Sequence, residues 1–194
     1  MHPDNAFRFD GDDALRAFVA ERAFAHLFAV TAAGPMVAHV PLSPHGDAWR
    51  FHIARRNRVA AHLDGAVVIA SIMGPDGYVS PDWYADARDQ VPTWTYVSVE
   101  IEATCHRLDE VALLAQIDTL SLVHEARLAP KPPWTSGKVA EPRLRALLAA
   151  IVAFELRPTA MLGTLKLSQN KSSADRAGVV AALGDAPLAK AMRE

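Results

Sequence analysis

Residues 93–108 read TWTYVSVEIEATCHRL, the clearest structural signal in the chain. Side chains of a β-strand point alternately to the two faces of a sheet. Apolar and polar residues alternate in this way here, with Val97, Val99, Ile101 and Ala103 on one side and Ser98, Glu100, Glu102 and Thr104 on the other. The pattern predicts a long, half-buried strand, which is typical of antiparallel sheets.

Shorter strand-like runs precede this strand. Turn residues separate the runs 26–32, 35–42 and 49–53, which predicts a β-meander. We expect a helix over 12–23 and a short helix over 55–63. The apolar run 66–73 is typical of a fully buried strand, and we expect it to end at the sequence GPDG, residues 74–77. The aromatic residues that follow, up to Pro92, indicate an ordered covering loop.

On the C-terminal side, Asp109 is the expected cap of a helix of about 17 residues. A helix over 141–150, strands over 151–157 and 161–167 with a turn at Pro158-Thr159, and a final helix from Ser172 to Gly184 follow. The regular strand and helix alternation of a parallel sheet is missing. We therefore predict one domain, residues 1–194, mainly β with peripheral helices, built on a small antiparallel barrel of six or seven strands.

Composition and charge exclude several classes of protein. Of the 194 residues 51% are hydrophobic and the formal charge is −2, which excludes a disordered chain and argues against direct DNA contact. The single cysteine, Cys105, excludes a disulfide framework, and the spacing of the histidines indicates no metal site. The start MHPDN does not resemble a signal peptide, and the longest apolar run has nine residues. We expect a cytoplasmic protein without membrane contact.

Arginine is concentrated at one place, Arg55-Arg56-Asn57-Arg58. Such a cluster suits a single phosphate group, because guanidinium groups form charge-assisted hydrogen bonds with it. A solvated turn is the alternative interpretation. No nucleophile motif is present, so catalytic residues stay unassigned, with His39 and His52 as the candidates for acid–base work.

Several motifs then occur in a fixed order along nearly the whole chain. They are FHIARRN (51–57), GPDGYVSPDWY (74–84), VPTWTYV (91–97) and GTLKLSQNKS (163–172), followed by DRAGV (175–179). Together they resemble the PaiB-like FMN-binding negative transcriptional regulators, whose fold is the split β-barrel shared with pyridoxamine 5′-phosphate oxidase. The resemblance implies a homodimer that binds FMN between its subunits.

The resemblance also implies where FMN binds. Arg55, Asn57 and Arg58 would hold the phosphate, aided by the N-terminus of the short helix, and the backbone of Ala38, His39, Val40 and Pro41 would line the flavin ring. The remaining candidates are His52, Ala54, Trp94, Tyr96, Lys166, Ser168, Gln169 and Asn170, of which the last four would reach the flavin of the other subunit. The chain departs from the family pattern at Arg58, Val59, Thr95 and Ala103.

Several alternatives stay open at this point. Trp94 and Tyr96, two apart on a strand, share a face that stacks on flavin, closes the dimer or forms a core pair. Residues 166–170 either contact flavin or form a helix-entry turn held by Asn170 and Ser172. The protein is either a flavin-dependent oxidoreductase with a small substrate or a regulator without enzymatic activity, and haem could replace FMN as the flat ligand.

Overall fold

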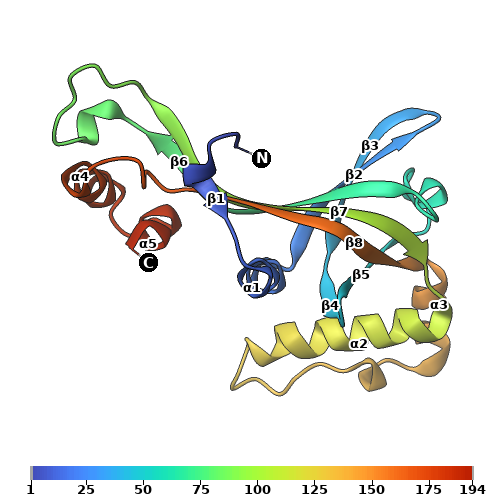
Figure 1. Cartoon of the computed structure of the whole chain (residues 1–194). Coiled ribbons are helices and arrows are strands. Elements are labelled where there is room, and N and C mark those ends of the chain that lie inside the picture. Colours follow the sequence, from blue (N-terminus) through green and yellow to red (C-terminus); the bar gives the residue numbers. More distant parts are fainter. Residues whose placement is uncertain (1, 194) are drawn as a thin grey trace. The chain divides into compact units, whose positions relative to one another are not determined.

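The structure, a computed structural model, describes residues 2–193. Its strands form one sheet in the order β3-β2-β6-β7-β8-β5-β4, and β1 pairs with β8 outside this order (Figure 1). The strands are β1 Arg8–Phe9, β2 Phe24–Thr31, β3 Gly34–Pro41, β4 Ser43–His45, β5 Ala48–Ala54, β6 Val67–Val79, β7 Thr93–Arg107 and β8 Ile151–Lys166.

Helices lie at the periphery of the sheet. They are α1 Asp12–Arg22, α2 Glu110–Ala126, α3 Glu141–Ala149, α4 Ser173–Leu183 and α5 Pro187–Arg193, with short 3₁₀ helices η1 Asn5–Phe7, η2 Ala60–His62, η3 Pro81–Trp83 and η4 Ser136–Lys138. Strand β2 pairs antiparallel with β3 and β6, and β5 pairs antiparallel with β4 and β8. The prediction of a mainly antiparallel sheet with peripheral helices is confirmed.

The described chain divides into two compact units. Unit 1 comprises the residues up to Phe18, Ile72–Glu100 and the residues from Leu162 onward, and unit 2 comprises Val19–Ser71 and Ile101–Met161. Strands β6, β7 and β8 pass from one unit into the other without interruption.

Unit 2 encloses an aromatic core. Trp49, Phe51 and Phe154 are almost completely buried, and the rings of Phe51 and Phe154 stack with centroids 5.4 Å apart. Helix α2 packs against β5 and β4, with Asp109 as its N-cap as predicted. Burying these large rings provides most of the favourable free energy available to a core of this kind.

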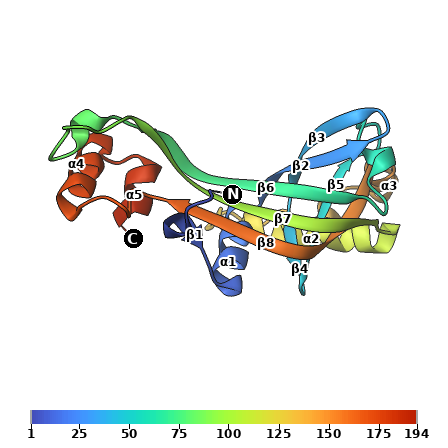
Figure 2. The same ribbon diagram turned by 45° about the horizontal axis from the view of Figure 1, so that its top comes forward.

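Unit 1 has its own core beneath α4 and α5, which lie side by side in Figures 1 and 2. Val79, Tyr84 and Val179 are among the residues buried there. Ser172 caps α4 as predicted, because its hydroxyl accepts the Asp175 N–H, and Gly184 ends the helix with φ of 60°. Helix α5, which follows directly after this turn, is not predicted from the sequence.

The helix predicted over 55–63 is wrong. Turns occupy most of this segment, and only the three residues of η2 are helical. The side-chain oxygen of Asn57 accepts the Val59 N–H at 3.1 Å, a local bond that competes with helix formation. No helix N-terminus therefore supports a phosphate at Arg55.

Two predicted strand breaks are also wrong, because β6 runs through Gly74 and β8 runs through Pro158. The pairing of β6 with β2 ends at Ser71, and the pairing of β8 with β5 ends at Leu156. Pro75 and Pro158 come after these points, so their missing N–H groups remove no hydrogen bond to β2 or β5. Gly74 is needed for packing, since a Cβ there would lie 2.8 Å from the Phe18 ring.

The apolar run in β6 is buried on one face only. Val68, Ala70 and Ile72 are buried, whereas Val67 and Ile69 are 75% and 41% exposed, so the prediction of a fully buried strand is wrong. Within residues 2–193, no helix has the length and apolar character required to cross a membrane.

Candidate functional site

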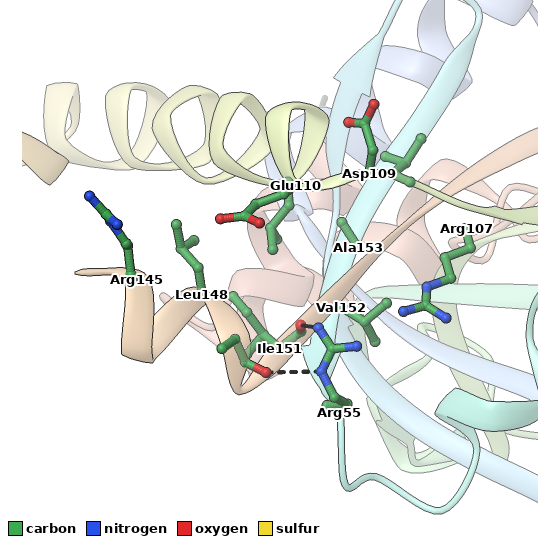
Figure 3. Close-up of a pocket in the computed structure, with 12 residues that line it drawn as sticks. Arg55, Arg107, Asp109, Glu110, Arg145, Leu148, Ile151, Val152 and Ala153 are labelled. Carbon is green, nitrogen blue, oxygen red and sulfur yellow. Dashed lines mark hydrogen bonds between the residues drawn. The ribbon is translucent and has the colours of Figure 1, made fainter. Parts of the chain in front are cut away.

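Arg55 stands directly after β5 in unit 2 and connects this strand to the end of α3. Its Nε donates to the Ala149 carbonyl at 2.9 Å and its Nη2 donates to the Ile151 carbonyl at 2.8 Å (Figure 3). The first bond satisfies a carbonyl group at the C-terminus of α3, where a cation is favourable, and the second reaches the first residue of β8. They hold the guanidinium in one orientation and leave its Nη1 available for a ligand.

Two neighbouring hollows in unit 2 share Arg55 and Arg107. The larger, of about 360 Å³, also has Asp109, Glu110 and Arg145 in its lining, and the smaller measures about 210 Å³. Figure 3 shows the guanidinium groups of Arg55 and Arg107 on either side of Val152. The two guanidinium groups favour an anion, and the carboxylates of Asp64, Asp109 and Glu110 line the same two hollows.

Arg107 is not among the site residues predicted from the sequence. It is the last residue of β7, after the alternating pattern and just before the helix cap. A charged residue at such a strand end, next to a helix start, is the signal that could have identified it.

The other phosphate candidates lie in the turn after β5. Arg58 is exposed, and Asn57 uses its oxygen for the turn, which leaves its NH₂ group as a donor. Ala54 ends the strand opposite Ile151. Of these three candidates, only Arg55 lines the two hollows together with Arg107, while Asn57 and Arg58 offer donors of the type that binds phosphate from the adjoining turn.

Strand β3 is at the edge of the sheet, so its backbone has one unpaired side. The Leu42 N–H donates to the Ala23 carbonyl, and the alternation of antiparallel pairing then directs the Ala38 and Val40 N–H groups toward β2 and the His39 N–H outward. Pro41 has no N–H. Of these candidates, His39 alone offers a donor to a flat ligand at this edge.

The two histidine candidates have different surroundings. The His39 ring is exposed and forms an edge-to-face pair with His26, with centroids 4.8 Å apart. His52 Nδ1 lies 2.8 Å from the side-chain oxygen of Gln116, a buried residue of α2. The amide of Gln116 therefore holds His52 in place, which only tertiary packing could reveal.

In unit 1, Trp94 and Tyr96 share a face of β7, as predicted. Trp94 is 54% exposed and its Nε1 donates to Asp76 at 3.0 Å, while Tyr96 is half-buried. The alternative of a core aromatic pair is wrong for Trp94. An exposed indole beside a phenol provides a surface on which a flat ring can stack.

The segment after β8 forms a compact turn in unit 1. The amide of Gln169 accepts from the Leu167 N–H at 2.7 Å and donates to the Leu165 carbonyl, so it is committed to the turn itself. Ser168 is buried with φ of 57°, while Asn170 is exposed. Lys166, Ser168 and Asn170 line one pocket of unit 1.

Cys105 is not a nucleophile. The side chain is fully buried in β7, and burial, with a smaller contribution from Asp64, raises its pKa to about 12. A thiol of this kind stays protonated and unreactive near neutral pH.

Comparison with known proteins places these observations in a family. A family model described as "Putative FMN-binding domain" matches residues 1–160. The chain is 25% identical to the Protease synthase and sporulation protein PAI 2 of Bacillus subtilis, over 100% of this chain and 95% of that protein.

Two solved structures resemble this one in fold. The FAD and heme binding protein of Mycobacterium smegmatis has a TM-score of 0.63 at 18% identity, over 92% of this chain and 81% of that one. The flavocytochrome Anf3 of Azotobacter vinelandii has a TM-score of 0.60 at 15% identity, over 85% and 72% of the two chains. The predicted split β-barrel fold is confirmed.

Proposed function

Because this chain belongs to the FMN-binding domain family that matches residues 1–160, we propose that it is a homodimer in which bound FMN exchanges electrons with a small-molecule substrate. FMN is the cofactor of this family, and when bound it supplies hydride and electron transfer. The protein contributes binding, orientation and electrostatics. We propose which residues of this chain fill these roles.

The shared position of Arg55 and Arg107 carries the proposal. Both guanidinium groups line the two hollows of unit 2, and Arg55 is held there by the Ala149 and Ile151 carbonyls. Arg58 and Asn57 add donors from the same turn. We assign the FMN phosphate to this set, because a phosphate of charge near −2 requires fixed cationic donors.

Titration with FMN and riboflavin tests this assignment. Arg107→Gln and Arg58→Gln should each raise the dissociation constant for FMN about tenfold or more, because a hydrogen bond to a charged group contributes about 1.5–3 kcal/mol. Riboflavin, which has no phosphate, should bind wild type and variants equally. Arg88→Gln, in an exposed ion pair with Asp86, is the matched control. Unchanged FMN affinity in both variants would overturn the phosphate assignment.

An exposed apolar face of unit 2 supports the homodimer. Phe24, Phe28, Val30, Val37, Val67 and Ile69 project from β2, β3 and β6 and are each more than a third exposed. The pairing register places Phe28 between Val37 and Ile69. Charged side chains are missing from these positions, so the face fits a second copy of itself better than a charged partner.

Light scattering coupled to gel filtration measures the oligomeric state. Wild type should be a dimer and Phe28→Asp a monomer, because the dimer would bury the added charge. Ala33→Asp, in the exposed turn between β2 and β3, should remain a dimer. Circular dichroism checks that the variants fold, and a monomeric wild type would overturn this part of the proposal.

The remaining candidates would contact the flavin ring. We propose that the His39 N–H and the backbone of β3 line one side, with His52 and Ala54 nearby, and that residues Trp94, Tyr96 and Lys166–Asn170 approach from the second chain. Trp94 is 54% exposed, which supports a stacking role. Quenching of FMN fluorescence should weaken in Trp94→Leu and persist in Val111→Leu, a substitution at another exposed position.

A regulatory protein without enzymatic activity is the second candidate, and the similarity to PAI 2, named for protease synthesis and sporulation, favours it. Salt-dependent binding of promoter DNA by the purified protein, with no reduction of FMN by NADH or NADPH, would favour this role. We place either activity in the cytoplasm within a single domain. The visible absorption spectrum of the isolated protein distinguishes FMN from haem.

A further inference from the structure

A second polar pocket lies within unit 1, formed where η1, the start of β7 and the turn after β8 meet. Its volume is about 220 Å³, and its lining includes Tyr84, Thr93, Thr95, Lys166 and Lys171. Pockets for whole drug-sized ligands span about 300–1,000 Å³. This pocket therefore suits one chemical group or a small molecule.

Two ammonium groups line the pocket, and neutral oxygens hold them. Lys166 Nζ donates to the Thr93 hydroxyl at 2.8 Å, and Lys171 Nζ donates to the Gln90 side-chain oxygen at 2.6 Å. The structure pairs neither lysine with a carboxylate within residues 2–193. The pocket thus has two ammonium groups without an ion pair among the described residues, while burial and, to a lesser extent, the Asp175 carboxylate raise the pKa of the neighbouring Tyr84 hydroxyl.

Two hydroxyl groups in the same lining have no partner. Thr95 is completely buried and Tyr84 is 6% exposed, and neither hydroxyl oxygen has a hydrogen-bond partner in the described structure. An unpaired buried polar group is costly, so each calls for an explanation. A ligand with several acceptor oxygens would satisfy both hydroxyls and both lysines.

We propose that this pocket binds a small oxyanion, a carboxylate or phosphate group of a free ligand. Lys166 and Lys171 supply the charge, and Thr95 and Tyr84 donate hydrogen bonds to its oxygens. We further infer that this anion positions the electron-transfer partner of the flavin, and this role rests on the proposed function. The binding of the anion to the pocket does not depend on the proposed function.

Calorimetric titration of the flavin-free protein with inorganic phosphate and with succinate, against a chloride solution of equal ionic strength, tests the pocket. One anion should bind per chain. Lys171→Gln should weaken binding about tenfold or more, and Thr95→Val, which keeps the shape and removes the hydroxyl, about threefold or more. Lys190→Gln, at an exposed position of α5, is the charge-matched control and should bind as wild type does. Failure of wild type to bind either anion, or unchanged binding by both pocket variants, would overturn the proposal.

Competition with flavins distinguishes a free ligand from the phosphate of FMN. If FMN displaces the anion and riboflavin does not, the pocket holds the flavin phosphate and our assignment to a free ligand is wrong. If the anion binds equally with and without FMN, the assignment is supported. Failure of the wild type to bind either anion would leave the Arg107 and Arg58 titrations unaffected. Displacement of the anion by FMN but not by riboflavin would also contradict the assignment of the FMN phosphate to Arg55 and Arg107.

Discussion

Replacing Gly178 by alanine should destabilise the protein, although helix propensity alone predicts the opposite. Gly178 lies inside α4, where alanine is favoured over glycine by about 1 kcal/mol. A Cβ at this position, however, would lie 2.1 Å from the backbone oxygen of Trp83 in η3. Helix and loop would have to separate by more than 1 Å, because ordinary contact begins at about 3.4 Å.

The expected magnitude follows from these two opposing effects. Overpacking a close contact costs about 1–3 kcal/mol, and a clash with backbone belongs at the upper end of this range. Subtracting the gain in propensity leaves a net loss of about 2 kcal/mol, or about 4–8 °C in Tm for a chain of this length.

Thermal and urea denaturation followed by tryptophan fluorescence measure this loss. Ala177→Gly, at the exposed neighbouring position, is the matched control and should cost about 1 kcal/mol from propensity alone. A Gly178→Ala protein as stable as wild type, or more stable, would refute the reasoning, because α4 would then not contact η3 as closely as described.

Further substitutions and treatments test other parts of the structure. Burial raises the pKa of Glu155, but Arg50 and then Arg157 outweigh this effect and hold it below its usual value. The ionised Glu155 carboxylate therefore stabilises the folded protein above about pH 4, and this stabilisation is lost as pH falls. Glu155→Gln should lower the free energy of unfolding, measured by urea denaturation, by about 1–3 kcal/mol at pH 7 and by less at pH 3. Cys105 should react with iodoacetamide only after unfolding, as mass spectrometry would show. Ser172→Ala should lower the free energy of unfolding, obtained from thermal denaturation, by about 1 kcal/mol, because it removes the N-cap of α4.

A Glu155→Gln penalty that does not change with pH would show that the carboxylate is not stabilised by its arginines. Labelling of Cys105 at the rate of a free thiol would contradict its burial. Equal stability of Ser172→Ala and wild type would exclude the cap as a contributor.

Local sequence signals predicted the long elements well. The alternation in β7 and the cap at Asp109 required only neighbouring residues, and both are confirmed. The predictions that strands end at Gly74 and Pro158 are wrong, because residues distant in the sequence decide whether a strand continues there. Gly74 leaves room within β6 for the ring of Phe18, and Pro158 lies past the pairing of β8 with β5. Neither relation can be read from neighbouring residues in the sequence.

The candidate site shows the same limit. The turn after β5 was recognised from its arginines, and FMN binding follows from the family. Arg107 joins Arg55 only through the pairing of strands, and Gln116 meets His52 only when α2 packs on β5. The hydroxyls of Thr95 and Tyr84 are unpaired because they are buried without a partner. Residue type alone does not determine whether a hydroxyl is buried, so these pocket residues could not be predicted from the sequence.

The continuity of β6, β7 and β8 through both units has a practical consequence for anyone who would dissect this protein. Each unit is assembled from separate stretches of chain, and the joints fall in the middle of hydrogen-bonded strands. No terminal truncation can deliver either one intact, and a protease would find no linker there to cut. Shortened chains should therefore yield insoluble fragments, and dissection by point substitution is the workable route.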